Sequence, residues 1–302
     1  MKSSPSLSPP SAPREIARTE ADSALRTSHS ALVEIWKFRP LIRELVRRDL
    51  KLRYKNSVGG IAWSLINPLM QILVITLVMK FIQVRPIKNY SAYLFVLFLW
   101  NFVSVSLSDG CVAILNNSQL VRKVYFPRAI LPLATLMGNL FHFAIAFGFT
   151  VLYFFVLRTY PEHLAAKFLL VVPVMFFSAV LCLGLILILS YLNVFYEDVR
   201  FIVNAVLQLG FFMLPIFFTI EQVKAKGFYD LYMLNPVAAF MVTYQRALLP
   251  PPSVALSLDG RVLAPVGIPW DYFALACCTS TIVLIVGFTL FNKHQWEMAE
   301  RL

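Results

Sequence analysis

Six long uncharged stretches dominate the pattern of hydrophobic and polar positions along this chain. Asp, Glu, Lys and Arg are missing between Lys55 and Lys80, Lys88 and Asp109, Arg128 and Arg158, Lys167 and Glu197, Arg200 and Glu221, and Asp271 and Lys293. About 20 apolar residues make a helix that crosses the hydrocarbon core of a membrane, whereas a soluble helix keeps a polar face. The pattern therefore predicts six transmembrane helices, at about 60–84, 92–115, 129–157, 168–192, 200–220 and 271–291.

Composition supports the same class. The chain is 59% hydrophobic and 14% charged, and soluble domains carry roughly 25% charged residues. We expect an all-α multi-pass membrane protein. Residues 1–30 are rich in Ser and Pro, so they cannot bury a core and are predicted to form a disordered cytoplasmic tail. They also lack the apolar region of a cleavable signal peptide.

A basic block precedes the first stretch and predicts the orientation. Eight Lys and Arg residues lie between Trp36 and Asn56, which favours a cytoplasmic N-terminus. Six spans return the C-terminus to the same side. The block is amphipathic, with Phe38, Leu41, Ile42, Leu45 and Leu52 on one face and Arg43, Arg47, Arg48 and Lys51 on the other. Within residues 31–56 it predicts an amphipathic interface helix. This helix would anchor the topology, contact a partner, or do both, and the membrane domain follows at 57–302.

A short basic and aromatic segment, Gln119–Leu133, separates the second and third stretches on the predicted cytoplasmic side. It contains Arg122, Lys123, Tyr125, Phe126, Pro127 and Arg128. Its charges either mark the cytoplasmic side or dock a partner. Glu197 and Asp198 lie in the other predicted cytoplasmic loop. They are suited to cap the following helix, because carboxylates favour the positive end of the helix dipole.

The predicted outer region, 221–270, contains a half-apolar stretch broken by Asn235, Pro236 and Arg246. Short apolar segments interrupted by proline are typical of re-entrant or interfacial helices. We expect a pair of gate helices here that includes Asn235, Pro236, Tyr244 and Arg246. A seventh full span is the alternative, and it would move the C-terminus outside.

Several kinds of chemistry are missing from the sequence. There is no G-x-x-x-x-G-K-[ST] phosphate loop, no HExxH and no GxSxG, so this chain is not expected to be an enzyme or to bind a nucleotide. The four cysteines lack metal-ligand spacing, and no metal site is expected. Charged residues do not form a chain within the spans, which argues against an ion-coupled pump. Asp109 ends an apolar run, and an ionisable residue within a span is a functional candidate. We favour the alternative, in which Asp109 lies near the cytoplasmic interface.

Four strings carry a resemblance to a known family. They are RDLKLRYKNSVGGIAWSLINPLMQILV, LVRKVYFPRAILPL, NVFYEDVRFIVNAVLQLGFFMLPIFFTIEQV and LNPVAAFMVTYQRALL. In this order they resemble the permease subunits of type-2 ABC exporters of cell-surface polysaccharides, a group that includes O-antigen, capsule and teichoic acid exporters. The likeness runs from about Arg39 to the C-terminus.

The resemblance implies partners and a location. It implies a homodimer with two copies of a cytoplasmic ATPase that binds the ATP and Mg, so this chain needs no cofactor of its own. It also implies a lipid-linked polysaccharide substrate, the bacterial inner membrane and no role for nucleic acid. The segment with Arg122, Lys123, Tyr125, Phe126, Pro127 and Arg128 would be the helix that couples to the ATPase. Glu197 and Asp198 would add a second contact, unless they only cap their helix.

Aromatic residues are the predicted lining of the sugar conduit, because their apolar faces suit sugar rings. The candidates are Trp63, Trp100, Tyr191, Phe211, Phe212, Phe217 and Phe218. The alternative is that these rings only face lipid. Two other functions stay open at this point. One is ABC export of lipid or small molecules, and the other is an ATPase-independent channel or lipid-handling protein.

Overall fold

The computed structural model describes residues 36–55, 62–81, 94–156, 168–213, 215–249, 255–256, 262–295 and 297–301. The predicted tail at 1–30 lies outside these residues. The helices are α2 (Arg39–Tyr54), α3 (Trp63–Phe81), α5 (Val96–Cys111), η2 (Leu115–Asn117), α6 (Ser118–Lys123), α7 (Ile130–Val156), α9 (Val171–Phe195), α10 (Val199–Met213), α11 (Ile220–Ala225), α12 (Tyr229–Met233), α13 (Pro236–Leu248), α14 (Trp270–His294) and α15 (Glu297–Arg301). Two short antiparallel strands, β1 (Ala255–Leu256) and β2 (Val262–Leu263), complete the described elements.

Three of these helices are long and apolar enough to cross a membrane. They are α7, α9 and α14, and a fourth candidate is α5 together with η2 and α6, which meet at a bend of 54°. The apolar part of α3 and the whole of α10 are shorter. The prediction of a multi-pass helical protein is therefore confirmed. Of the six predicted spans, three to four are long and apolar enough among the described residues.

The predicted span at 200–220 is shorter in the structure than in the sequence pattern. Helix α10 has 15 residues and ends at Met213, two residues before Pro215. Proline cannot donate the backbone hydrogen bond that a helix interior requires. A new helix, α11, then starts with a capping box in which Thr219 and Gln222 exchange hydrogen bonds. Such a box satisfies the free N–H groups of the first turn.

Helices α9 and α14 form the tightest contact of the bundle. A Cβ atom added to Gly184 of α9 would lie 2.6 Å from the backbone nitrogen of Leu284 in α14. At Gly287 of α14, an added Cβ would collide with the carbonyl oxygen of Gly184. Small residues let membrane helices approach until their backbones touch. The two glycines therefore determine how closely α9 and α14 pack.

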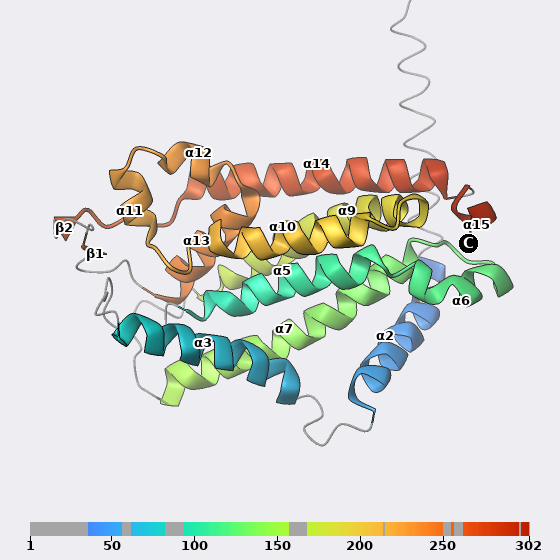
Figure 1. Cartoon of the computed structure of the whole chain (residues 1–302), viewed down its shortest axis with the longest axis horizontal. Helices are drawn as coiled ribbons and strands as arrows, with labels where there is room; N and C mark the ends of the chain where they lie inside the picture. The colour runs from blue at the N-terminus through green and yellow to red at the C-terminus, as the bar shows by residue number, and fades with distance from the viewer. Residues whose placement is uncertain are drawn as a thin grey trace, which may run out of the picture.

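The two ends of the bundle are built differently. Figure 1 shows α2, α6 and α15 at one end, and α11, α12 and the strand pair at the other. We call these the α2 end and the α11 end. Helix α13 reaches the core near the α11 end, and its residues from Ala238 to Leu248 are all buried. It packs on α14, α9 and α5.

Candidate functional site

At the α2 end, helix α2 packs against the segment Gln119–Leu133. Ile42 and Leu45 of α2 share one buried cluster with Phe126, Ile130 and Leu131. The amphipathic pattern thus gives α2 its buried side, and that side covers the turn between α6 and α7. Arg43, Arg47 and Lys51 lie on the exposed side of α2.

The two neighbouring aromatic residues of this segment have opposite environments. Phe126 is 6% exposed, whereas Tyr125 is 74% exposed. We expected both rings to anchor a partner. For Phe126 this expectation changes, because its ring is already buried by α2 and α7 of the same chain. Phe126 holds the segment in place, and Tyr125 is the ring that faces outward.

Basic residues surround the exposed ring. Arg122 and Lys123 lie in the last turn of α6 and are exposed. Pro127 and Arg128 are half-buried, and their carbonyl groups accept hydrogen bonds from Ile130 and Leu131 in the first turn of α7. Partial burial lowers the pKa of the Arg128 guanidinium, an effect that Tyr125 opposes. Arginine nevertheless stays protonated in proteins, so this face is positively charged.

Polar contacts fasten α2 to the bundle at two further points. The first is Arg48, which donates to the side chain of Asn117 at 2.6 Å and to Asp49 at 2.9 Å. The second is Arg53, which pairs with Asp109 at 2.6 Å and donates to Asn139 at 3.1 Å. Arg48 lies on the exposed charged face of α2, as its position in the sequence predicts, and also forms this contact with Asn117.

The Arg53 network joins three helices. Asn139 of α7 donates to Asp109 of α5 at 3.3 Å, so both contact Arg53 of α2 and each other. Asp109 therefore lies beside the basic helix α2. Its partner Arg53 was not among the predicted site residues. The sequence gives a weak signal for this pair, since an acidic residue at the end of an apolar run needs a counter-charge.

The second predicted contact loop and the chain's last described helix lie at the same end. Glu197 and Asp198 are exposed between α9 and α10. Helix α15 returns to this region, where the Arg301 guanidinium lies 5.1 Å from the centre of the Phe195 ring. Met298 is buried in a cluster with Ile114 and Ala129. The α2 end thus combines α2, α6, the α9–α10 loop and α15.

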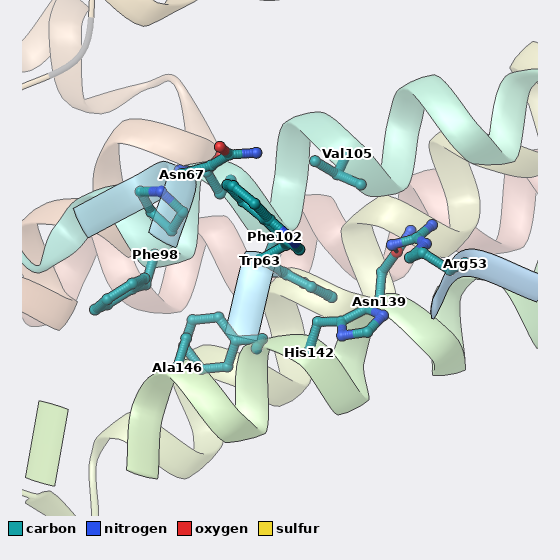
Figure 2. Close-up of a pocket in the computed structure, with 12 residues that line it drawn as sticks. Arg53, Trp63, Asn67, Phe98, Phe102, Val105, Asn139, His142 and Ala146 are labelled. Atoms are coloured by element: carbon teal, nitrogen blue, oxygen red, sulfur yellow. Dashed lines mark hydrogen bonds between the residues drawn. The ribbon is translucent and has the colours of Figure 1, made fainter. Parts of the chain in front are cut away.

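A pocket of about 400 Å³ opens between α3, α5 and α7, beside the C-terminal turn of α2. Its aromatic lining consists of Trp63, Phe98, Phe102 and Phe143, and its polar lining consists of Asn67, Asn101, Asn139, His142 and Arg53. Figure 2 shows Arg53, Asn139 and His142 near one end and Asn67 and Phe98 near the other. The volume falls within the range of small-molecule sites, roughly 300–1,000 Å³.

The predicted conduit residues do not form one group. Trp63 lines the pocket, whereas Trp100 is 7% exposed and its ring covers Gly210 of α10. Phe211, Phe212 and Phe217 form a cluster with ring centres 5.3–5.8 Å apart. The remaining two residues lie elsewhere: Phe218 contacts Tyr232, and Tyr191 contacts His294 at the α2 end. Among the aromatic candidates, Trp63 is the residue that joins the pocket.

The predicted gate residues lie at the start and in the buried part of α13. The side chain of Asn235 accepts a hydrogen bond from Val237 and caps the helix, and Pro236 occupies its first turn. Tyr244 is fully buried. Helix α13 is thus a buried helix near the α11 end, and a re-entrant gate at these residues stays a prediction.

Arg246 forms a buried ion pair that the sequence analysis missed. Its guanidinium donates to Glu221 of α11 at 2.5 Å, and both side chains are 1% exposed or less. The same carboxylate oxygen accepts a hydrogen bond from the backbone of Val266, close to β2, at 3.1 Å. The pair therefore ties α11, α13 and the strand region together. In the sequence, Glu221 marks only the boundary of an uncharged stretch.

These features define a class: a multi-pass helical membrane protein with a basic, aromatic face at one end and a polar pocket between its helices. Among the residues that the structure describes, no group of His, Cys, Asp and Glu is suited to hold a metal. Residues 40–249 match the sequence model of the ABC-2 type transporter family. The chain belongs to this family of membrane transport proteins.

Relatives with known names cover almost the same length. The chain is 27% identical over 264 residues to an O-antigen export system permease protein RfbA of Klebsiella pneumoniae, a match that spans 87% of this chain and 95% of the relative. It is 30% identical over 271 residues to the O-antigen export system permease protein RfbA of Myxococcus xanthus, which spans 89% of this chain and 98% of the relative.

Proposed function

We propose that this chain is the transmembrane subunit of an ATP-driven exporter that moves a cell-surface polysaccharide or lipid-linked glycan, similar to O-antigen, out of the cytoplasm. Its family and the names of its relatives support this function. The ATP and Mg would bind to a separate ATPase chain. The relevant membrane would be the bacterial inner membrane, with both termini in the cytoplasm.

The observation that carries this proposal is the exposed face formed by Arg122, Lys123 and Tyr125. It projects from a segment whose other side is packed on α2 and α7. A rigidly held aromatic ring among cations is typical of a protein-binding hot spot, in which aromatic and Arg side chains dominate the affinity. We infer that the ATPase docks here and that Glu197 and Asp198 provide a second contact.

The complete arrangement that we propose contains two copies of this chain and two ATPase subunits. Each chain would contribute six spans, with α3 and α10 as the two that are short in the structure. Both carry exposed apolar side chains, among them Leu73 and Val74 of α3 and Val206 and Leu209 of α10. Twelve helices enclose a path for a sugar polymer more readily than six do. Helix α2 would lie at the cytoplasmic membrane surface, where basic residues meet anionic headgroups.

Replacing Tyr125 by alanine tests the docking face. We expect Tyr125→Ala to weaken binding of the ATPase by roughly 30-fold, since a hot-spot residue contributes about 2 kcal/mol or more. Co-purification of the ATPase and glycan export in cells would measure the loss. Phe228→Ala, an exposed ring at the α11 end (59% exposed), is the matched control and should bind normally. Normal ATPase binding by Tyr125→Ala would refute this docking face.

A further inference from the structure

The pocket between α3, α5 and α7 has the mixed lining of a carbohydrate site. Four aromatic rings provide apolar faces, and three asparagines and His142 provide donors and acceptors. Aromatic faces pack on the C–H surfaces of sugar rings. Amides both donate and accept hydrogen bonds, which matches hydroxyl groups, because these also do both.

The charges around the pocket favour an uncharged ligand. Arg53 is the cation among the lining residues, and its guanidinium is paired with Asp109 at 2.6 Å and donates to Asn139. An anionic group would have to compete with the Asp109 carboxylate for the same guanidinium. The two opposite charges leave this end of the pocket without a net charge.

Polar side chains continue from the pocket along α3. Asn67 and Gln71 are four residues apart, so they lie on one face of the helix, and both are exposed. Asn101, across the pocket on α5, donates to Gln71 at 3.4 Å. Amides that face lipid without partners are costly, and polar residues within spans typically face a ligand path. This face of α3 is therefore suited to a polar ligand rather than to acyl chains.

We propose that this pocket is a binding site for uncharged sugar residues of the exported glycan, with Trp63 and Phe102 packing on the sugar ring and Asn67, Asn101 and His142 bonding its hydroxyl groups. The inference rests on the proposed function and deepens it. It places sugar recognition between α3, α5 and α7 of one chain. The phenylalanine cluster at the end of α10 is not part of this site.

Photocrosslinking in exporting cells tests the site with the cell's own glycan as the probe. A benzophenone amino acid would replace Val105, which lines the pocket and is 37% exposed, in the full chain with its ATPase. The matched control carries the same group at Phe141, which is 45% exposed but not among the lining residues. A third variant carries it at Phe212, in the α10 cluster. Periodate and hydrazide labelling of the purified chain would detect attached sugar.

A glycan adduct at position 105 and not at 141 supports the proposal. Adding Asn67→Leu should then lower the yield of this adduct by roughly 2- to 10-fold, the usual effect of one lost hydrogen bond. Met70→Leu, at an exposed position on the same helix, is the control and should leave the yield unchanged.

Two results would overturn the sugar site and leave the proposed function standing. One is a glycan adduct at position 212 but not at 105. The other is an adduct at 105 that retains radiolabelled phosphate and loses its sugar in mild acid, which would show that the pocket holds a charged carrier group. Absence of a glycan adduct at position 105 in cells whose export depends on this chain would also overturn the site alone, whereas normal export in cells that lack this chain would contradict the proposed function.

Discussion

At the residue scale, neighbouring positions of the chain have different structural roles. Tyr125 and Phe126 look equivalent in the sequence, but one is exposed and the other is buried. Arg246 looks like an interruption of an apolar stretch, but it is completely buried against Glu221. Sequence patterns identify the residue types at such positions. They do not identify the partner, because the partner comes from a distant part of the chain.

The Glu221–Arg246 pair makes a prediction about stability. Glu221→Gln should lower the free energy of unfolding by about 3–5 kcal/mol, since breaking a buried pair leaves an uncompensated charge. The double change Glu221→Leu with Arg246→Met should recover much of this loss. The native pair leaves the second carboxylate oxygen and two guanidinium nitrogens without partners among the described residues. Thermal unfolding in detergent would measure both variants. Equal destabilisation by the single and double changes would contradict this account.

At the scale of elements, the long helices could be predicted from the sequence and the pocket could not. Uncharged stretches predicted α7, α9 and α14 to within three residues at each end, because a membrane span imposes length and composition together. The pocket depends on how far α3 stands from α5 and α7, which a single sequence does not specify. One sign of this pocket is visible in the sequence: the polar residues Asn67 and Gln71 lie four positions apart in an otherwise apolar stretch.

Because α9 and α14 are in close contact, we expect substitution by alanine to affect stability differently at Gly184 and at Gly148. Gly184→Ala should destabilise the protein by about 1–3 kcal/mol, the usual cost of overpacking, because its Cβ would meet the backbone of Leu284. Gly148→Ala in α7 is the matched control, since no atom lies within 4 Å of its added Cβ. It should be neutral or stabilising by about 0.5–1 kcal/mol. Thermal unfolding would compare the two, and similar melting temperatures would argue against the close contact.

At the scale of the whole molecule, the two ends of the bundle are suited to different surroundings. The α2 end carries the basic helix and the exposed face of α6, and the α11 end carries the short helices α11 and α12 and the buried ion pair that joins α11 to α13. The sequence predicted α2, α6 and the α9–α10 loop on one side, because alternate loops of a multi-pass protein share a side, and in the structure these segments lie at the same end. The sequence did not predict that α13 is buried, since its burial depends on packing against α9 and α14.

Cysteine labelling tests the proposed topology. In a variant without its four native cysteines, Lys226→Cys at the α11 end should react with a membrane-impermeant maleimide added to intact spheroplasts. Arg301→Cys at the α2 end should react only after the membrane is opened. Both positions are exposed in the structure, so access to the reagent depends on the side of the membrane. Labelling of Arg301→Cys in intact spheroplasts would refute the six-span arrangement and favour a seventh span.

The Arg53 network affects the order in which the helices can pack while the chain is being synthesised. Its partners Asp109 and Asn139 follow Arg53 by 56 and 86 positions, so they do not exist when α2 leaves the ribosome. Until α7 is synthesised, α2 cannot bury its apolar side against Ile130 and Leu131. We expect helix α2 to join the bundle only when α7, in the third predicted span, has been synthesised. Its final docking would complete the face that we propose for ATPase binding.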